Sequence, residues 1–120
     1  MKFSIVVNAS PELPASRAAL HFCQAITDQA HVIHRVFFLN EGVLNAHVGQ
    51  KISNDWAKFF ATNNCDAACC TASCQTNGLA DTLGAASATI NPAFSIAGLG
   101  QLVEASSRSD RLITFGQRTC

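Results

Sequence analysis

Near its beginning the chain contains the run Phe3-Ser-Ile-Val-Val7, which is almost continuously apolar, rich in β-branched residues and bounded by Asn8-Ala-Ser-Pro11. A strand with one face in water alternates polar and apolar residues, whereas a strand covered on both faces does not. The run therefore predicts a buried strand of a parallel sheet.

Strand and helix patterns alternate along the rest of the chain. Apolar residues recur with helical spacing from Pro14 to Gln29, and a second strand is expected from Val32 to Leu39. The further expected elements are a loop or short helical turn over 42–53, a helix from Ser53 or Asn54 to Asn63-Asn64, a short strand over 65–71, a helical stretch to Asn77-Gly78, either a helix or a loop over 79–92, a segment over 95–100 leading into a helix through 102–105, and a strand over 111–115. This alternation predicts an α/β fold, with a parallel sheet and helices on both faces.

Composition limits the classes of function. At 120 residues the chain fits one domain, and its charged fraction of 13% is about half the usual level. Interface cores are depleted in charge, so we expect an oligomer. Eight basic and eight acidic residues balance without a basic run, which argues against direct nucleic-acid binding.

The apolar runs and the cysteines indicate a compartment. No window approaches the length of a transmembrane helix, and the run at the start is too short for a signal peptide, so we expect a cytoplasmic protein without membrane contact. Six cysteines are then expected to be thiols rather than disulfides. Their spacing lacks the paired Cys-x-x-Cys of a structural zinc site, so no metal is predicted. Cys120, on a polar tail, is expected to be incidental.

Three cysteines lie in Asp66-Ala-Ala-Cys-Cys-Thr-Ala-Ser-Cys74, where a short strand is expected to pass into a helix. Reactive groups collect at the carboxyl ends of parallel strands, and a helix start lowers the pKa of a thiol. Cys70 is therefore the candidate nucleophile, while strand alternation sends Cys69 to the other face. Cys74, one helical turn later, would stack under Cys70 as an auxiliary thiol. Each of the three also fits an inert packing role.

Other residues carry weaker signals. His47 follows a turn and would line the same end of the sheet as Cys70, although loop histidines are commonly just solvated. Gly98-Leu-Gly100 matches neither phosphate-loop pattern, so these glycines are expected to permit tight packing at a helix start. Glu104 and Asp110 have no paired acid and are assigned no acid–base role.

Four segments, in the same order, resemble the sulfur-relay family that includes TusD and DsrE. They are Met1-Lys-Phe-Ser-Ile-Val-Val7, Val36-Phe-Phe-Leu-Asn-Glu-Gly-Val-Leu-Asn-Ala46, Gly98-Leu-Gly-Gln-Leu-Val-Glu-Ala-Ser106 and Ser109-Asp-Arg-Leu-Ile-Thr-Phe115. The resemblance implies a single DsrE-like domain over residues 1–120, folded as a three-layer α/β sandwich with a mostly parallel central sheet. It also implies assembly with related subunits, since TusD and DsrE work in heterohexamers with two smaller relatives.

The resemblance also implies an activity. The family's active cysteine is followed by small residues, a glycine and an acid, a pattern that falls on Cys70-Thr-Ala-Ser-Cys-Gln-Thr-Asn-Gly78 with Asp81 beyond, at the expected distance from Trp56. Cys70 is thereby implied to be the persulfide carrier of a cofactor-independent sulfurtransferase. It would take sulfur from an upstream persulfide donor protein and pass it to a downstream cysteine acceptor protein, for tRNA 2-thiouridine formation or for sulfur oxidation.

Two alternatives remain open from the sequence. The chain would also serve as a non-catalytic structural subunit of such an assembly, because some relatives lack the active cysteine. A thiol-redox protein that forms a Cys70–Cys74 disulfide is the other alternative. The chain departs from its relatives at Cys74, usually a small apolar residue, and at Thr76 and Asn77, where relatives carry basic residues.

Overall fold

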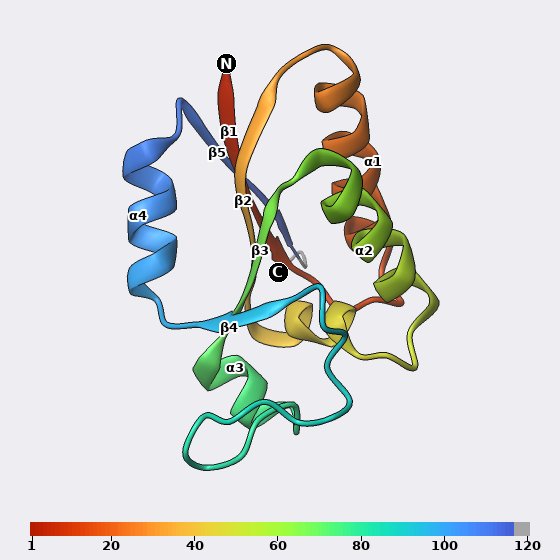
Figure 1. Ribbon diagram of the computed structural model, residues 1–120, viewed down its shortest axis with the longest axis vertical. Coiled ribbons are helices and arrows are strands. Elements are labelled where there is room, and N and C mark those ends of the chain that lie inside the picture. The colour runs from red at the N-terminus through yellow and green to blue at the C-terminus, as the bar shows by residue number, and fades with distance from the viewer. Residues whose placement is uncertain (117–120) are drawn as a thin grey trace.

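The computed structural model describes residues 1–116, so Cys120 lies outside the described residues. These residues contain a five-stranded parallel sheet with the strand order β4-β3-β2-β1-β5 (Figure 1). The elements are β1 (Lys2–Asn8), α1 (Pro14–Asp28), β2 (Val32–Phe38), the 3-10 helix η1 (Asn40–Ala46), α2 (Lys51–Asn63), β3 (Asp66–Cys70), α3 (Thr71–Thr76), β4 (Ser95–Ala97), α4 (Gly100–Arg108) and β5 (Arg111–Gly116).

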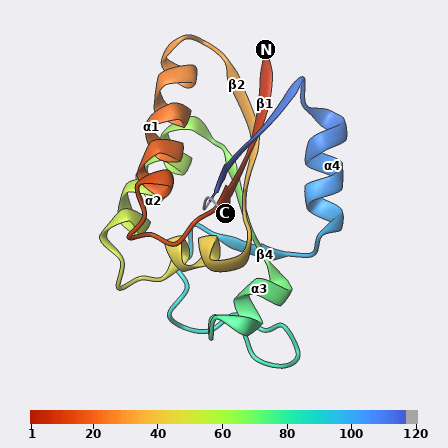
Figure 2. The ribbon, with the colours of Figure 1, turned by 180° about the vertical axis from the view of Figure 1, so that it is seen from behind.

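The elements form three layers. Helices α1 and α2 cover one face of the sheet and α4 covers the other, as the two opposite views show (Figures 1 and 2). The short helices η1 and α3 lie at the carboxyl edge of the sheet. The predicted single-domain α/β sandwich is confirmed. No helix within residues 1–116 is long and apolar enough to cross a membrane.

Strand β1 is an inner strand, between β2 and β5, which explains its almost continuous apolar run. Its side chains alternate between two hydrophobic clusters. Ile5 and Val7 belong to the larger cluster under α1 and α2, whereas Val6 belongs to a smaller cluster on the other face. A strand with both faces covered needs apolar residues at successive positions.

The two clusters differ in size and content. The larger one contains a group of aromatic rings, in which Phe38 meets Trp56 edge-on at 5.2 Å between ring centroids. The smaller one, called here the α4-side cluster, consists of Val6, Phe37, Ala68 and Cys70, with the partly buried Leu39, Ala97 and Leu102 packed against it. This asymmetry matters because the candidate nucleophile lies in the smaller cluster.

The turn after β2 holds the carboxyl edge together. A Cβ added to Gly42 would collide with the backbone carbonyl of Val7, so close approach requires glycine there. The buried amide of Asn45 donates to Ala9 O (3.2 Å), Ser16 Oγ (3.1 Å) and Gly42 O (2.9 Å) and accepts from Trp56 Nε1 (3.2 Å). This segment therefore serves as a scaffold for the carboxyl edge.

Three expectations needed resolution or correction. The 79–92 segment is a loop with isolated bridges at Ala80–Ala86 and His47–Ile90 rather than a helix. Residues 95–97, expected only to lead into a helix, form strand β4. The expectation of tight packing at Gly98 and Gly100 was wrong, because a Cβ added at either position would meet nothing within 4 Å.

Candidate functional site

Cys70 is the last residue of β3 and the residue immediately before α3. Its backbone is extended, with φ −60° and ψ 127°, so the chain changes direction at this residue. Its side chain lies in the α4-side cluster and is 4% exposed. Ala97 of β4 is its neighbour across the parallel ladder, and Leu102 of α4 packs against the same cluster. Leu39, after β2, packs against this cluster as well, so the cluster that holds the thiol is enclosed by residues of three segments.

Cys69 and Cys74 lie together in the larger cluster, on the opposite face of the sheet, and both are fully buried. Their thiols lie close enough for each to shift the pKa of the other. The neighbouring Cys74 thiol and burial raise the pKa of the Cys69 thiol, because both favour its neutral form. The expected stacking of Cys74 under Cys70 is corrected by this arrangement: Cys70 precedes the helix instead of lying within it, and Cys74 meets Cys69.

His47 is half-buried and takes part in local contacts. Its Nδ1 accepts a hydrogen bond from the Gly49 N–H at 2.9 Å, and its backbone pairs with Ile90 in an isolated bridge. These contacts join the turn before α2 to the 79–92 loop. The structure thus connects His47 to that loop and records no contact between His47 and Cys70 among the described residues.

A shallow hollow of about 280 Å³ opens at the carboxyl edge beside α3, lined by Asn40, Glu41, Ala72, Ser73, Thr76 and Asn77. Asn40 adopts a left-handed backbone with φ 53°, and its N–H donates to Ser73 Oγ at 2.8 Å. Asn77 Nδ2 donates to Ser73 O, also at 2.8 Å. Sequence reasoning missed Asn40 and Ser73; the signal for Asn40 was an asparagine at a strand end, which tolerates a left-handed backbone.

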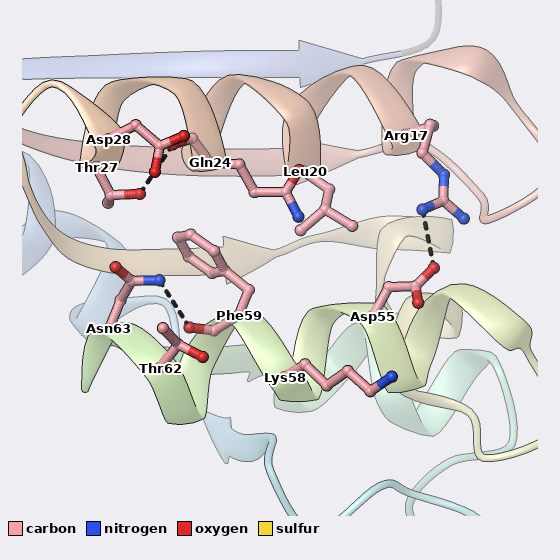
Figure 3. Close-up of a pocket in the computed structure, with 10 residues that line it drawn as sticks. All are labelled: Arg17, Leu20, Gln24, Thr27, Asp28, Asp55, Lys58, Phe59, Thr62 and Asn63. Carbon is pink, nitrogen blue, oxygen red and sulfur yellow. Dashed lines mark hydrogen bonds and ion pairs between the residues drawn. The ribbon is translucent and has the colours of Figure 1, made fainter.

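The larger hollow lies between α1 and α2 and has a volume of about 560 Å³ (Figure 3). An ion pair between Arg17 and Asp55, 2.8 Å long, crosses it near one end, and Phe59 and Leu20 contribute apolar surface. Its lining contains neither cysteine nor histidine. Because it lies on the α1–α2 face, it is separated by the sheet from the cluster that holds Cys70.

Charged side chains attach α4 to the sheet. Glu104 Oε1 lies 3.0 Å from both His34 Nε2 and Arg35 Nη1, and Arg35 Nη1 also donates to the Gln101 carbonyl at 3.0 Å. The hydrogen bond from His34 and the charges of His34, Arg35 and Arg108 lower the pKa of Glu104. Glu104, expected to be a lone acid, thus has partners that are distant in sequence.

The described residues contain no group of three or more histidine, cysteine, aspartate or glutamate side chains placed to hold a metal ion. The arrangement around Cys70 offers one thiol at the carboxyl end of an inner strand, β3. Such a thiol is suited to nucleophilic exchange with another sulfur once it becomes accessible.

Comparison with known sequences identifies relatives over nearly the whole chain. Residues 1–115 match the DsrE/DsrF-like family. The putative sulfurtransferase DsrE of Allochromatium vinosum is 36% identical over 97% of this chain and 99% of its own length. The sulfurtransferase TusD homolog of Pseudomonas aeruginosa is 34% identical over 97% of this chain and 98% of its own. The sulfurtransferase TusD of Salmonella arizonae is 33% identical over 96% and 100%, respectively.

Solved structures show the same fold at lower sequence identity. The ychN protein from E. coli superposes with a TM-score of 0.80 at 20% identity, covering 96% of this chain and 99% of that one. A protein of unknown function from Methanobacterium thermoautotrophicum gives a TM-score of 0.75 at 8% identity, covering 93% and 97%. At such identities the likeness concerns the fold alone.

Proposed function

This chain belongs to the DsrE/DsrF-like family, and from that membership we propose that it is a sulfur-relay subunit that carries sulfur as a persulfide on Cys70. Relatives named sulfurtransferase TusD or DsrE support a sulfurtransferase role in a sulfur relay. The observation that carries the assignment to Cys70 is its position as the final residue of β3, at the carboxyl edge of the sheet.

The chemistry needs one thiolate and no cofactor. Cys70, after losing its proton to water, attacks the outer sulfur of a donor persulfide; its new S–S bond forms as the donor's S–S bond breaks, and the donor leaves as a thiolate. A cysteine thiolate of the acceptor then attacks the outer sulfur of Cys70–S–SH, and Cys70 leaves as a thiolate. Each step is a thiol exchange with no net oxidation, so its rate depends on thiolate fraction and access.

The upstream and downstream partners follow from this chemistry. The donor is a protein persulfide and the acceptor is a protein cysteine, in the cytoplasm, where thiols stay reduced. We assign the relay to tRNA 2-thiouridine formation on the strength of the TusD relatives, with sulfur oxidation as the alternative that the DsrE relative represents. A net charge of zero supports delivery to a protein rather than to the nucleic acid itself.

Assembly with related subunits is part of the same proposal. Apolar side chains remain exposed on α4 and on the edge strand β5: Leu99 is 55% exposed, Val103 69% and Leu112 41%. A low charged fraction and an exposed apolar surface are typical of subunit contacts. We therefore place a subunit contact at the edge strand β5, where Leu112 is exposed.

The experiment that tests the carrier is intact-protein mass after incubation with glutathione persulfide, for the wild type, Cys70→Ser and Cys74→Ser. We expect a gain of one sulfur, reversible by reductant, in the wild type and in Cys74→Ser. Cys70→Ser should gain none. Equal gain by Cys70→Ser, or no gain by the wild type, would contradict the proposal and favour a non-catalytic structural subunit.

The same samples test the thiol-redox alternative. A Cys70–Cys74 disulfide would appear as loss of two hydrogen atoms without added sulfur. The structure favours the carrier over this alternative, because Cys74 packs with Cys69 in the larger cluster, on the face of the sheet opposite Cys70.

A further inference from the structure

The thiol that would exchange sulfur is enclosed. Cys70 is 4% exposed, and its neighbours in the α4-side cluster include Leu39, Ala97 and Leu102. Attack on a donor persulfide requires the Cys70 sulfur to approach the outer sulfur of the donor within bonding distance, with the leaving sulfur of the donor in line. One of the elements that cover Cys70 must therefore move before sulfur can be exchanged.

Helix α4 is attached to the sheet mainly by polar contacts. Within α4, all of which the structure describes, Ala105 is the one buried residue. Leu102 supplies the partly buried apolar contact over the cluster. The ion pairs of Glu104 are partly accessible to water, since its side chain is 40% exposed while those of His34 and Arg35 are 24% and 12% exposed, and water weakens the attraction within such pairs.

The other two covering elements are held more firmly. Strand β4 pairs with β3 along the ladder, and Ser95 Oγ donates to the Ala67 carbonyl at 2.8 Å. The Leu39 N–H donates to the Val7 carbonyl at 3.0 Å, and the next residue, Asn40, is bonded to Ser73. Movement of either would break backbone hydrogen bonds of the sheet or its edge.

The connection before α4 has the properties of a hinge. Gly98 and Gly100 flank Leu99 between β4 and the body of α4, and a Cβ at either glycine would meet nothing within 4 Å. Neither glycine has the left-handed backbone that L side chains avoid, since positive φ among the described glycines occurs at Gly78 and Gly84. Neither packing nor backbone conformation in this closed form requires glycine here. What glycine adds is freedom to adopt other conformations.

We propose that α4 is a lid over Cys70, which swings on Gly98 and Gly100 and uncovers the thiol for sulfur exchange. The inference rests on the proposed function for its purpose, since it explains how an enclosed carrier meets its donor and acceptor. Figure 1 shows the geometry: the chain leaves β4 beside the end of β3 and continues into α4, which lies alone along that face of the sheet.

The lid is tested by the rate at which iodoacetamide alkylates Cys70 in the folded protein, followed by peptide mass spectrometry. Cys23, fully buried in the larger cluster, is an internal control for global unfolding. We expect Cys70 to react faster than Cys23 and more slowly than in the unfolded chain. Equal rates at Cys70 and Cys23, or a Cys70 rate equal to that of the unfolded chain, would overturn the lid.

Alanine at the hinge should hold the lid closed. Alanine restricts the open conformations more than the closed one, so Gly98→Ala and Gly100→Ala are each expected to slow Cys70 alkylation by about two- to fivefold. Gly116→Ala is the matched control. Gly116 lies in β5, outside the hinge, and its added Cβ would make an ordinary contact with Asn8 Cβ at 3.7 Å. Unchanged Cys70 rates in both hinge variants would contradict the proposal.

Removing the cover should have the opposite effect. Leu102→Ala is expected to speed Cys70 alkylation by about tenfold without a matching rise at Cys23, because a packed leucine side chain is lost from the lid. A parallel variant, Leu39→Ala, distinguishes access past α4 from access past the turn after β2. If Leu39→Ala speeds the reaction while Leu102→Ala leaves it unchanged, the turn after β2 is the gate and the lid proposal is wrong.

The alkylation experiment tests the lid and the sulfur-loading experiment tests the proposed function, and either can give a negative result without the other. Iodoacetamide reports access to Cys70 whether or not the protein carries sulfur. Variant-dependent alkylation in a protein that never gains sulfur would support the lid and contradict the proposed function. Sulfur loading of Cys70 with alkylation rates unaffected by the hinge would support the function and contradict the lid.

Discussion

Replacement of Asn45 by alanine tests whether its buried amide holds the carboxyl edge together. The substitution removes three donated hydrogen bonds and the one accepted from Trp56 Nε1. The Ala9 carbonyl keeps its bond from Ser16 Oγ at 2.8 Å, so the group left without a partner is chiefly the indole N–H. Both Asn45 and Trp56 are fully buried, which denies water to that N–H.

The expected loss of stability follows from these contacts. A buried donor left unsatisfied costs about 1–3 kcal/mol, and the other bonds contribute about 1 kcal/mol each at most. We therefore expect Asn45→Ala to lower the free energy of unfolding by about 2–4 kcal/mol, from urea denaturation at fixed protein concentration. Fixed concentration matters because assembly raises apparent stability.

A double-mutant cycle separates the indole bond from general packing. Trp56→Phe removes the N–H, so Asn45→Ala should cost less in that background than in the wild type. We expect a coupling free energy of about 1–2 kcal/mol, the range for residues joined by a hydrogen bond. If the stability losses of the two single variants sum to that of the double variant within about 0.3 kcal/mol, the unsatisfied indole N–H is not the cause of the destabilisation by Asn45→Ala.

Three further predictions concern other parts of the molecule. Gly42→Ala should destabilise the fold by about 3 kcal/mol or more, because the clash is with backbone that cannot turn away, while Gly98→Ala should change thermal stability little. Leu112→Glu should shift size-exclusion elution toward a smaller species with unchanged circular dichroism; unchanged elution would remove β5 from the subunit contact. The pKa of Glu104 is depressed in the folded state, so its contribution to stability is present above its ordinary pKa of 4.5 and is lost as pH falls through the folded value. Glu104→Gln should therefore lose less stability than the wild type between neutral pH and about pH 3; equal losses would contradict a role for the Glu104 pairs in attaching α4.

Sequence patterns located the longer elements well. The strand over 3–7, the helix from Pro14 and the strand ending in Phe115 appear where their apolar periodicity placed them, because that periodicity records which faces are covered. Strand β4 escaped prediction because three residues are too few for a period. The 79–92 segment, rich in small residues, has no apolar period that separates helix from loop.

For the candidate site, too, the sequence predicted some features correctly and one wrongly. The sequence was enough to place Cys70 at the carboxyl end of a strand and to send Cys69 to the opposite face, since side chains of a strand alternate. It predicted the wrong partner for Cys74, because the relation between Cys70 and Cys74 depends on whether Cys70 lies inside the helix or before it.

By itself, then, the sequence determined the α/β class, the strand that ends in Cys70 and the family, because these depend on local periodicity and on short motifs. The tertiary structure alone decided that Cys70 lies in the α4-side cluster, that Cys69 and Cys74 share the other face, and that Glu104 meets His34. These contacts join residues that are far apart along the chain, or residues whose side chains are brought to the same face of the sheet only when the helices pack on it. Local patterns carry no record of them, because they form only when the sheet is assembled and its two faces are covered.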